Sequence, residues 1–274
     1  MTEIKNNPKN KKEAGSVEIE FYTDPLCCWS WAMEPQWRRL RFAYQGKVKW
    51  RYRMGGLIPN WDSFSDPMNA VSRPLQMGPL WLEAKYKSGM PIRERVWYEN
   101  PPKSSYPACI AVKAAEMQSP VAAEAYLRKL REAIMLHGKD IADWEVLQQV
   151  GEELHKENQA LVDVDRLQRD MGSKAAREAF EEDLQQVRLH GISRFPALTM
   201  KREGEGQGVI IIGYRPYEAL EEALHQVAPE LQPIPHTTDE TEYRRYWGSM
   251  TERELEEVLR MQGPASPKPA KETT

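Results

Sequence analysis

The sequence has few cysteines and no long apolar run. Three cysteines in 274 residues are too few for a disulfide framework. No apolar stretch approaches the roughly 18 residues that a membrane-spanning helix needs, so we expect no membrane partner. The N-terminal segment has lysines but lacks the apolar centre of a secretory signal, which predicts a cytoplasmic protein. In that compartment structural disulfides are rare, so a functional cysteine is expected to be a reactive thiol.

Charge and histidine content argue against two further classes of protein. The net charge of −3 provides no electrostatic basis for binding nucleic acid, so we expect no nucleic-acid partner. The five histidines are scattered and show no metal-ligand spacing, and two adjacent cysteines alone make no zinc site. We therefore expect no metal. The hydrophobic content of 41% is sufficient for a packed globular core.

Hydrophobic periodicity predicts an α/β chain. Alternating runs indicate strands, and apolar residues at helical spacing indicate helices. The segments follow the order strand, helix, strand, a long helical block, and then two strands and a helix. Their expected positions are 17–23, 29–44, 47–54, 75–190, 195–200, 209–214 and 216–227. A further helix is predicted by the capping-box pair Thr251 and Glu254.

Two of the three cysteines lie in the segment "DPLCCWSWAMEP". Cys27 stands between a predicted strand and a predicted helix, where unpaired backbone N–H groups and the helix dipole favour an anion. This position predicts a lowered thiol pKa. Ser30 occupies the place of the second cysteine in a Cys-x-x-Cys pair. Cys28 either shares the same field or is a small core residue.

These motifs, in this order, resemble the DsbA family of thioredoxin-fold proteins. The family pattern Asp-x-x-Cys-Pro-x-Cys-aromatic matches Asp24, Cys27 and Trp31, with Cys28 in place of the proline and Ser30 in place of the second cysteine. The similarity is strongest to the cytosolic FrnE-like and Spx-adaptor branches. It implies an α/β thioredoxin fold with a mixed β-sheet (βαβ…ββα) and a large helical insertion.

The resemblance also implies a set of site residues. A cis-proline before the third strand should face the nucleophile, and "GISRFPALTM" supplies one. Cys109 could act as a resolving thiol, although its Ala-rich surroundings also suit a core residue. His190 and Arg194 could provide positive charge near the thiolate. The expected catalytic residues are Cys27, Ser30 and Pro196, and the supporting residues are Cys28, Trp29 and Phe195.

The same comparison suggests a division of the chain. Residues 17–54 and 192–228 form the thioredoxin-like domain, and residues 55–191 form a loop and helical insertion. The remaining segments are a disordered tail over 1–16, a C-terminal helical extension over 229–262 and a second disordered tail over 263–274.

Three functions remain open at this level. The first is a thiol-disulfide oxidoreductase or isomerase that acts through Cys27 on protein thiols or disulfides. It would need no bound cofactor, and glutathione could serve as a co-substrate. The second is a non-enzymatic adaptor that holds a protein partner. The third is a glutathione transferase of the kappa type, which resembles the chain less because that class has serine where Cys27 stands. With Ser30 in place of a thiol, Cys27 can form a mixed disulfide but cannot release it alone.

Overall fold

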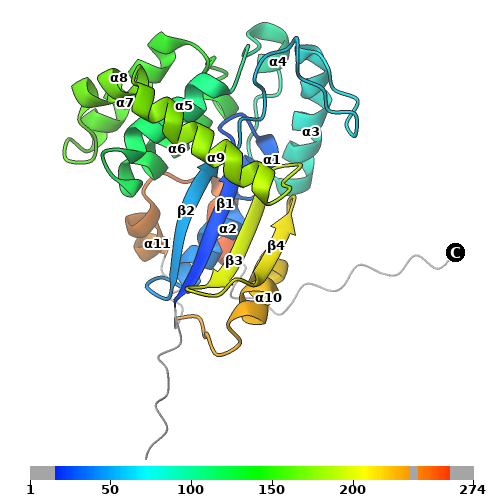
Figure 1. Ribbon diagram of the computed structural model, residues 1–274, viewed down its shortest axis with the longest axis vertical. Helices are drawn as coiled ribbons and strands as arrows, with labels where there is room; N and C mark the ends of the chain where they lie inside the picture. The colour runs from blue at the N-terminus through cyan, green and yellow to red at the C-terminus, as the bar shows by residue number, and fades with distance from the viewer. Residues whose placement is uncertain (1–15, 235–239, 260–274) are drawn as a thin grey trace, which may run out of the picture.

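Four strands form one mixed sheet, in the order β2-β1-β3-β4 (Figure 1). The computed structural model describes residues 16–234 and 240–259, so the tails expected at 1–16 and 263–274 lie outside the described residues apart from Ser16. β1 is parallel to β2 and antiparallel to β3, and β3 is antiparallel to β4. The strands span Val17–Thr23 (β1), Val48–Met54 (β2), Ala197–Arg202 (β3) and Gly208–Ile212 (β4). The predicted succession along the chain, with two strands before and two after the helical block, is confirmed.

Residue alternation in β1 assigns its side chains to the two faces of the sheet. Val17, Ile19 and Phe21 are buried against the helices α2 (Glu34–Ala43) and α10 (Tyr217–Val227). Glu18 and Glu20 point to the opposite face because successive strand residues alternate. Helix α9 (Lys174–Leu189) crosses that opposite face (Figure 1). The sheet is therefore covered by helices on both sides.

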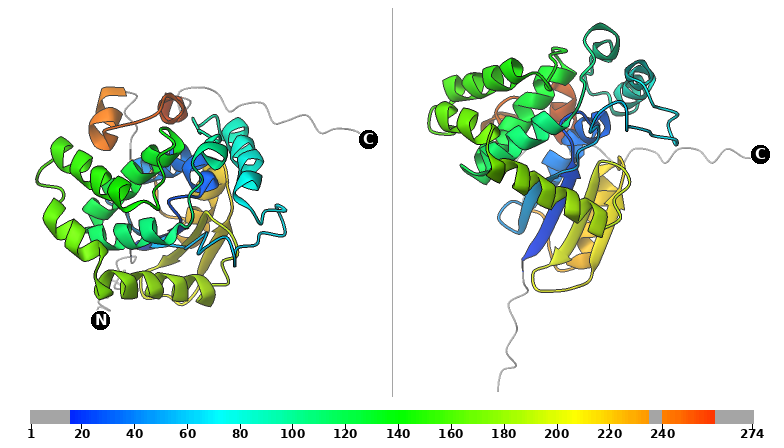
Figure 2. Two further views of the ribbon diagram at one scale, coloured as in Figure 1. Left: turned by 90° about the horizontal axis from the view of Figure 1, so that it is seen from above. Right: turned by 45° about the horizontal axis from the view of Figure 1, so that its top comes forward.

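The segment between β2 and β3 is helical and contains no strand, as predicted for residues 75–190. Its helices pack around their own apolar core, beyond the ends of β1 and β2 where the site residues lie (Figures 1 and 2). Before α9 they are η1 (Pro74–Gln76), α3 (Met77–Ser88), α4 (Val96–Glu99), α5 (Tyr106–Glu116), α6 (Pro120–Met135), α7 (Trp144–Glu157) and α8 (Val164–Met171).

The prediction of one continuous helix over residues 29–44 is wrong, because this segment forms two helices. The structure has a short α1 (Cys28–Ala32) and a separate α2, joined at Met33. Pro35 lies in the first turn of α2 and has no N–H to donate to a carbonyl in α1. The chain therefore starts a second helix at Glu34, and α1 is left as a short helix that carries the thiol motif.

Two C-terminal helices, α11 (Glu240–Trp247) and α12 (Glu252–Leu259), complete the described chain. The predicted capping box is present: Thr251 N donates to Glu254 Oε2 at 2.7 Å, and Glu254 N donates to Thr251 Oγ1 at 3.3 Å. The Glu254 carboxylate is fully buried between Arg38 of α2, at 3.1 Å, and Arg128 of α6, at 2.7 Å. These ion pairs fix α12 to the rest of the molecule.

Replacing Glu254 by Ala should destabilise the fold strongly. Burial disfavours the charged carboxyl, but Arg38 and Arg128 outweigh that effect and hold the pKa of Glu254 below its usual value. Loss of the carboxylate breaks a buried ion pair of both Arg38 and Arg128, which keep only Glu34 and Glu132 as carboxylate partners, and breaking a buried pair costs about 3–5 kcal/mol. Urea unfolding at pH 7 measures this loss. Because the folded-state pKa is lowered, the contribution is present above the ordinary glutamate pKa and disappears as the pH falls through the folded value.

Glu252→Ala is the matched control, since Glu252 is exposed in the same helix. Its free energy of unfolding should stay within about 0.5 kcal/mol of wild type. Equal stability of the Glu254 and Glu252 variants would contradict the proposed role of the buried pairs.

Candidate active site around Cys27

Cys27 occupies the N-cap of α1, directly after β1, as predicted. Its sulfur accepts a hydrogen bond from Ser30 N at 3.3 Å. The turn is closed on the other side by Asp24, because Cys27 N donates to Asp24 O at 3.0 Å and Leu26 N donates to Asp24 Oδ1 at 2.8 Å. The strand end and the helix start therefore hold the sulfur in one place.

The Asp24 carboxylate also joins this turn to the helical insertion. Its Oδ2 accepts from Leu57 N at 2.6 Å, Ser105 Oγ at 2.7 Å and Cys109 Sγ at 3.3 Å. Ser105 is the N-cap of α5, but its side chain does not cap that helix and bonds Asp24 instead. Burial raises the pKa of Asp24 even though four donors favour its charged form.

The pKa of Cys27 does not follow the prediction from its position. The Ser30 N–H and hydroxyl favour the thiolate, as a helix N-terminus should, but burial outweighs them and raises the pKa of the thiol. The negative charge of Asp24 raises it further, while Arg131 opposes this. Only 4% of Cys27 is exposed. The expected lowering is therefore wrong for this state of the molecule, because desolvation of the sulfur exceeds the effect of the helix terminus.

The loop before β3 lies at the same end of the sheet as Cys27, because β3 begins beside the end of β1. The Phe195–Pro196 peptide bond is cis, as predicted. Gly213 N, just after β4, donates to Pro196 O at 2.7 Å and holds this turn. The Phe195 ring packs on Gly55, where an added Cβ would lie 2.1 Å from the ring. A glycine after β2 is therefore required for the observed position of Phe195.

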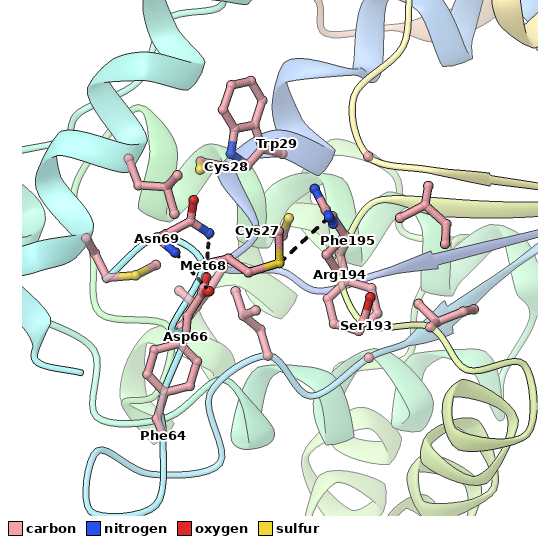
Figure 3. A pocket seen from close by; sticks show the side chains of 18 of the residues that line it. Cys27, Cys28, Trp29, Phe64, Asp66, Met68, Asn69, Ser193, Arg194 and Phe195 are labelled. Carbon is pink, nitrogen blue, oxygen red and sulfur yellow. Dashed lines mark hydrogen bonds between the residues drawn. The ribbon is translucent and has the colours of Figure 1, made fainter. Parts of the chain in front are cut away.

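A cavity of about 760 Å³ opens beside these residues and is lined by Cys27, Cys28 and Trp29 (Figure 3). The loop before the cis-proline contributes Ser193, Arg194 and Phe195. The opposite wall comes from the loop after β2, which includes Phe64, Asp66, Met68 and Asn69. The Arg194 guanidinium donates to Met68 Sδ at 3.7 Å, so the two walls touch in front of Cys27 (Figure 3).

Of the other predicted site residues, Cys28 and Trp29 line the cavity, whereas Ser30 and Cys109 do not. Cys28 lines the cavity but is 2% exposed and belongs to the core of the helical block. Trp29 contacts Tyr214 at a ring-centroid distance of 5.9 Å and lines the same cavity. Ser30 is fully buried, and its hydroxyl has no hydrogen-bond partner of ordinary geometry among the described residues. Cys109 is fully buried in the core and is absent from the cavity wall.

His190 and Arg194 take different positions. His190 ends α9, packs edge-on against Tyr22 and does not line the cavity. Arg194 does line it. Sequence reasoning missed Gly55, the loop after β2 and Arg215, which follows β4 on the cavity wall. The Gly55–Gly56 pair was a visible signal, but its meaning depends on Phe195, which lies far away in the sequence.

The sheet, the cis-proline turn and the cysteine at a helix N-terminus define a protein of the thioredoxin fold. The chain belongs to the thioredoxin family, whose model matches residues 21–222. Curated relatives include the ClpXP adapter protein SpxH of Halalkalibacterium halodurans, 28% identical over 82% of this chain and 73% of that protein. SpxH of Bacillus subtilis is 27% identical over 87% and 77%.

Solved structures show the same fold at lower identity. A candidate disulfide isomerase from Nitrosomonas europaea has a TM-score of 0.63 and 22% identity, covering 77% of this chain and 97% of its own. The cytosolic disulfide reductase DsbM of Pseudomonas aeruginosa has a TM-score of 0.57 and 21% identity, covering 77% and 100%. The predicted thioredoxin fold and the similarity to Spx adaptors are confirmed. No helix among the described residues is long and apolar enough to cross a bilayer.

Alkylation of Cys27 should have a pH midpoint above about 8.5, the ordinary thiol value, because burial raises its pKa. Asp24→Asn should move the midpoint down, since it removes a negative charge that raises the same pKa. The measurement is the rate of iodoacetamide modification at Cys27 against pH, followed by peptide mass spectrometry.

Asp165→Asn, on the exposed side of α8, removes the same charge at a distance and should leave the midpoint unchanged. A wild-type midpoint below the ordinary value would show that the helix N-terminus, and not burial, dominates the site. Far-UV circular dichroism verifies that the Asp24 variant is folded.

Proposed function

We propose that this protein carries out thiol-disulfide exchange through Cys27 as a monothiol oxidoreductase or isomerase. One observation supports this most directly: the Cys27 sulfur lies at a helix N-terminus and lines a cavity whose facing wall is the cis-proline loop. This arrangement offers a disulfide a surface to bind and a sulfur to react with. The cytosolic DsbM, which shares the fold, supports action in the cytoplasm.

The exchange step needs only the thiolate of Cys27 and a disulfide. The thiolate attacks one sulfur of the disulfide, forms a Cys27–sulfur bond and expels the second sulfur as a thiolate, which takes up the proton that Cys27 released. The Ser30 N–H and hydroxyl both favour the Cys27 anion. The hydroxyl has no other partner of ordinary geometry among the described residues, so it is free to donate to the anionic sulfur.

Release of the product from Cys27 requires a thiol from outside the site. Ser30 carries a neutral hydroxyl, which does not displace a thiol from sulfur. Cys109 donates to the Asp24 carboxylate inside the core, and burial raises its pKa well above the ordinary value. Burial does the same to Cys28. A small thiol such as glutathione, entering the cavity as its thiolate, would complete the cycle by attacking the sulfur of the bound group, forming a new disulfide with that group and expelling Cys27 as a thiolate.

A second candidate function is that of an adaptor. It is favoured by the SpxH relatives, which carry the name ClpXP adapter protein. The raised Cys27 pKa also suits a site that holds a partner without reacting. In this case the thioredoxin-like groove would bind a protein, and the cysteines would not be needed for the main activity. Co-purification with ClpXP that is unchanged in Cys27→Ala would support this function.

Wild-type protein exposed to oxidised glutathione should accumulate a long-lived mixed disulfide on Cys27, because no neighbouring thiol can resolve it. Cys27→Ala should abolish the adduct. Ser30→Cys should shorten its lifetime and raise insulin reduction, since it restores the second thiol of a Cys-x-x-Cys pair. Non-reducing mass spectrometry measures the adducts.

Cys109→Ala is the control for a hidden resolving thiol. An unchanged adduct lifetime is expected from its bond to Asp24, whereas a longer lifetime would identify Cys109 as the resolver. If the folded wild type forms no adduct on Cys27, the enzymatic proposal fails.

A further inference from the structure

The charge of the cavity wall differs in sign from that of the whole protein. Five ionisable acid and base side chains line the cavity: Asp66, Glu83, Lys87, Arg194 and Arg215. Three of them are cationic, although the chain as a whole carries a net charge of −3. Lys87 and Glu83 neutralise each other, with Nζ and Oε1 2.6 Å apart. Asp66 offsets one of the two arginines, so the wall keeps an excess of one positive charge, which the arginines supply.

Neither arginine has a carboxylate partner within the described chain. Arg194 contacts Met68 Sδ at 3.7 Å, and a thioether is a weak acceptor. Arg215 Nη1 donates to the carbonyl of the preceding residue, Tyr214, at 3.0 Å. A guanidinium group has five N–H donors in a planar fork, so most donors of both side chains remain available to a ligand.

Both side chains lie at the cis-proline turn. Arg194 is two residues before Pro196, and Arg215 is two residues after Gly213, whose N–H bonds Pro196 O. Gly213 has φ +81°, and an added Cβ there would lie 3.8 Å from Arg215 Nη1. The Arg215 guanidinium is therefore folded back over Gly213, beside the turn. Arg194 points into the cavity near Cys27 in the close view (Figure 3).

We infer that Arg194 and Arg215 form an anion site that selects small peptide disulfides with carboxylates close to the reacting sulfur. This inference rests on the proposed exchange at Cys27 and names its substrate class. A carboxylate that docks on Arg194 would replace only the weak contact with Met68. The cavity volume of about 760 Å³ is within the range that holds small molecules, which favours a short peptide over a folded protein.

Solvent-exposed arginines without partners are common, and exposed ion pairs are weak. Two features separate this pair from ordinary surface arginines. Both lie beside the cis-proline turn, and both retain free donors on the wall of a cavity that Cys27 also lines. The expected selectivity is modest, because each guanidinium remains accessible to water and salt.

The test compares two disulfides on the full-length chain. Glutathione disulfide carries carboxylates on both halves and is negatively charged, whereas 2-hydroxyethyl disulfide is neutral. Arg194→Gln and Arg215→Gln should each slow modification of Cys27 by glutathione disulfide about two- to fivefold, and the double variant should slow it about tenfold. The rate with the neutral disulfide should be unchanged. The measurement is the rate of Cys27 adduct formation by mass spectrometry.

Arg177→Gln is the matched control, because it removes the same charge from an exposed position of α9 that does not line the cavity. It should leave both rates unchanged. Equal slowing with both disulfides would show that the arginines only shape the loop and would overturn the inference. Slowing by Arg177→Gln as large as that of the site variants would overturn it as well, since net charge alone would then explain the effect.

A binding measurement separates this inference from the exchange chemistry. S-methylglutathione cannot react with Cys27 but keeps both carboxylates, and its binding is measured by titration calorimetry. Weaker binding in the double variant supports the anion site even if no disulfide modifies Cys27, in which case only the proposed exchange fails. Absent binding to wild type, or equal binding to the double variant, overturns the anion site whatever the reactivity of Cys27.

Discussion

The buried carboxylate of Asp24 is the contact on which the arrangement of the site depends. Its oxygens accept hydrogen bonds from four donors. These are Leu26 N in the thiol turn, Leu57 N after β2, and Ser105 Oγ and Cys109 Sγ at the start of α5. One side chain therefore fixes the thiol turn, one cavity wall and the helical insertion relative to each other. A buried carboxylate persists only when donors compensate its desolvation. The four donors bond the carboxylate where the insertion meets the sheet, and they offset its desolvation only in part, because the pKa of Asp24 stays raised.

The same junction is supported by buried arginines. Arg131 of α6 donates to Thr23 at the end of β1 and to Glu34 at the start of α2. Arg128 of α6 bonds Glu254 of α12. Such pairs contribute little net stability compared with apolar packing, but removing one partner is costly. These ion pairs connect α6 to α2 and α12, so they hold the three helices in their observed positions. The C-terminal helices therefore belong to the scaffold that supports the site.

Local patterns in the sequence predicted most of the fold, whereas the site depends on long-range contacts. Alternation in β1 and the capping box at Thr251 each act within a few residues, and the structure confirms them. The cis bond before Pro196, which the family resemblance implied, is also present. The break before Pro35 also had a local signal, which the helical periodicity obscured. The sign of the Cys27 pKa shift could not be predicted in this way. It depends on the burial of the sulfur in the folded chain and on the charge of Asp24; Asp24 belongs to the thiol motif, but the burial that dominates the shift is not visible there.

The hydroxyl at position 30, in place of a second thiol, limits what the site can do. Ser30 supplies an N–H and a hydroxyl that favour the Cys27 thiolate, so the anion retains the stabilisation that a helix N-terminus offers. It does not supply a nucleophile, so the lifetime of any Cys27 mixed disulfide depends on thiols that reach the cavity from outside. A site with a slow release step spends more of its cycle bound to its partner. In such a protein, catalytic exchange and the prolonged holding of a partner differ only in the rate of that one step.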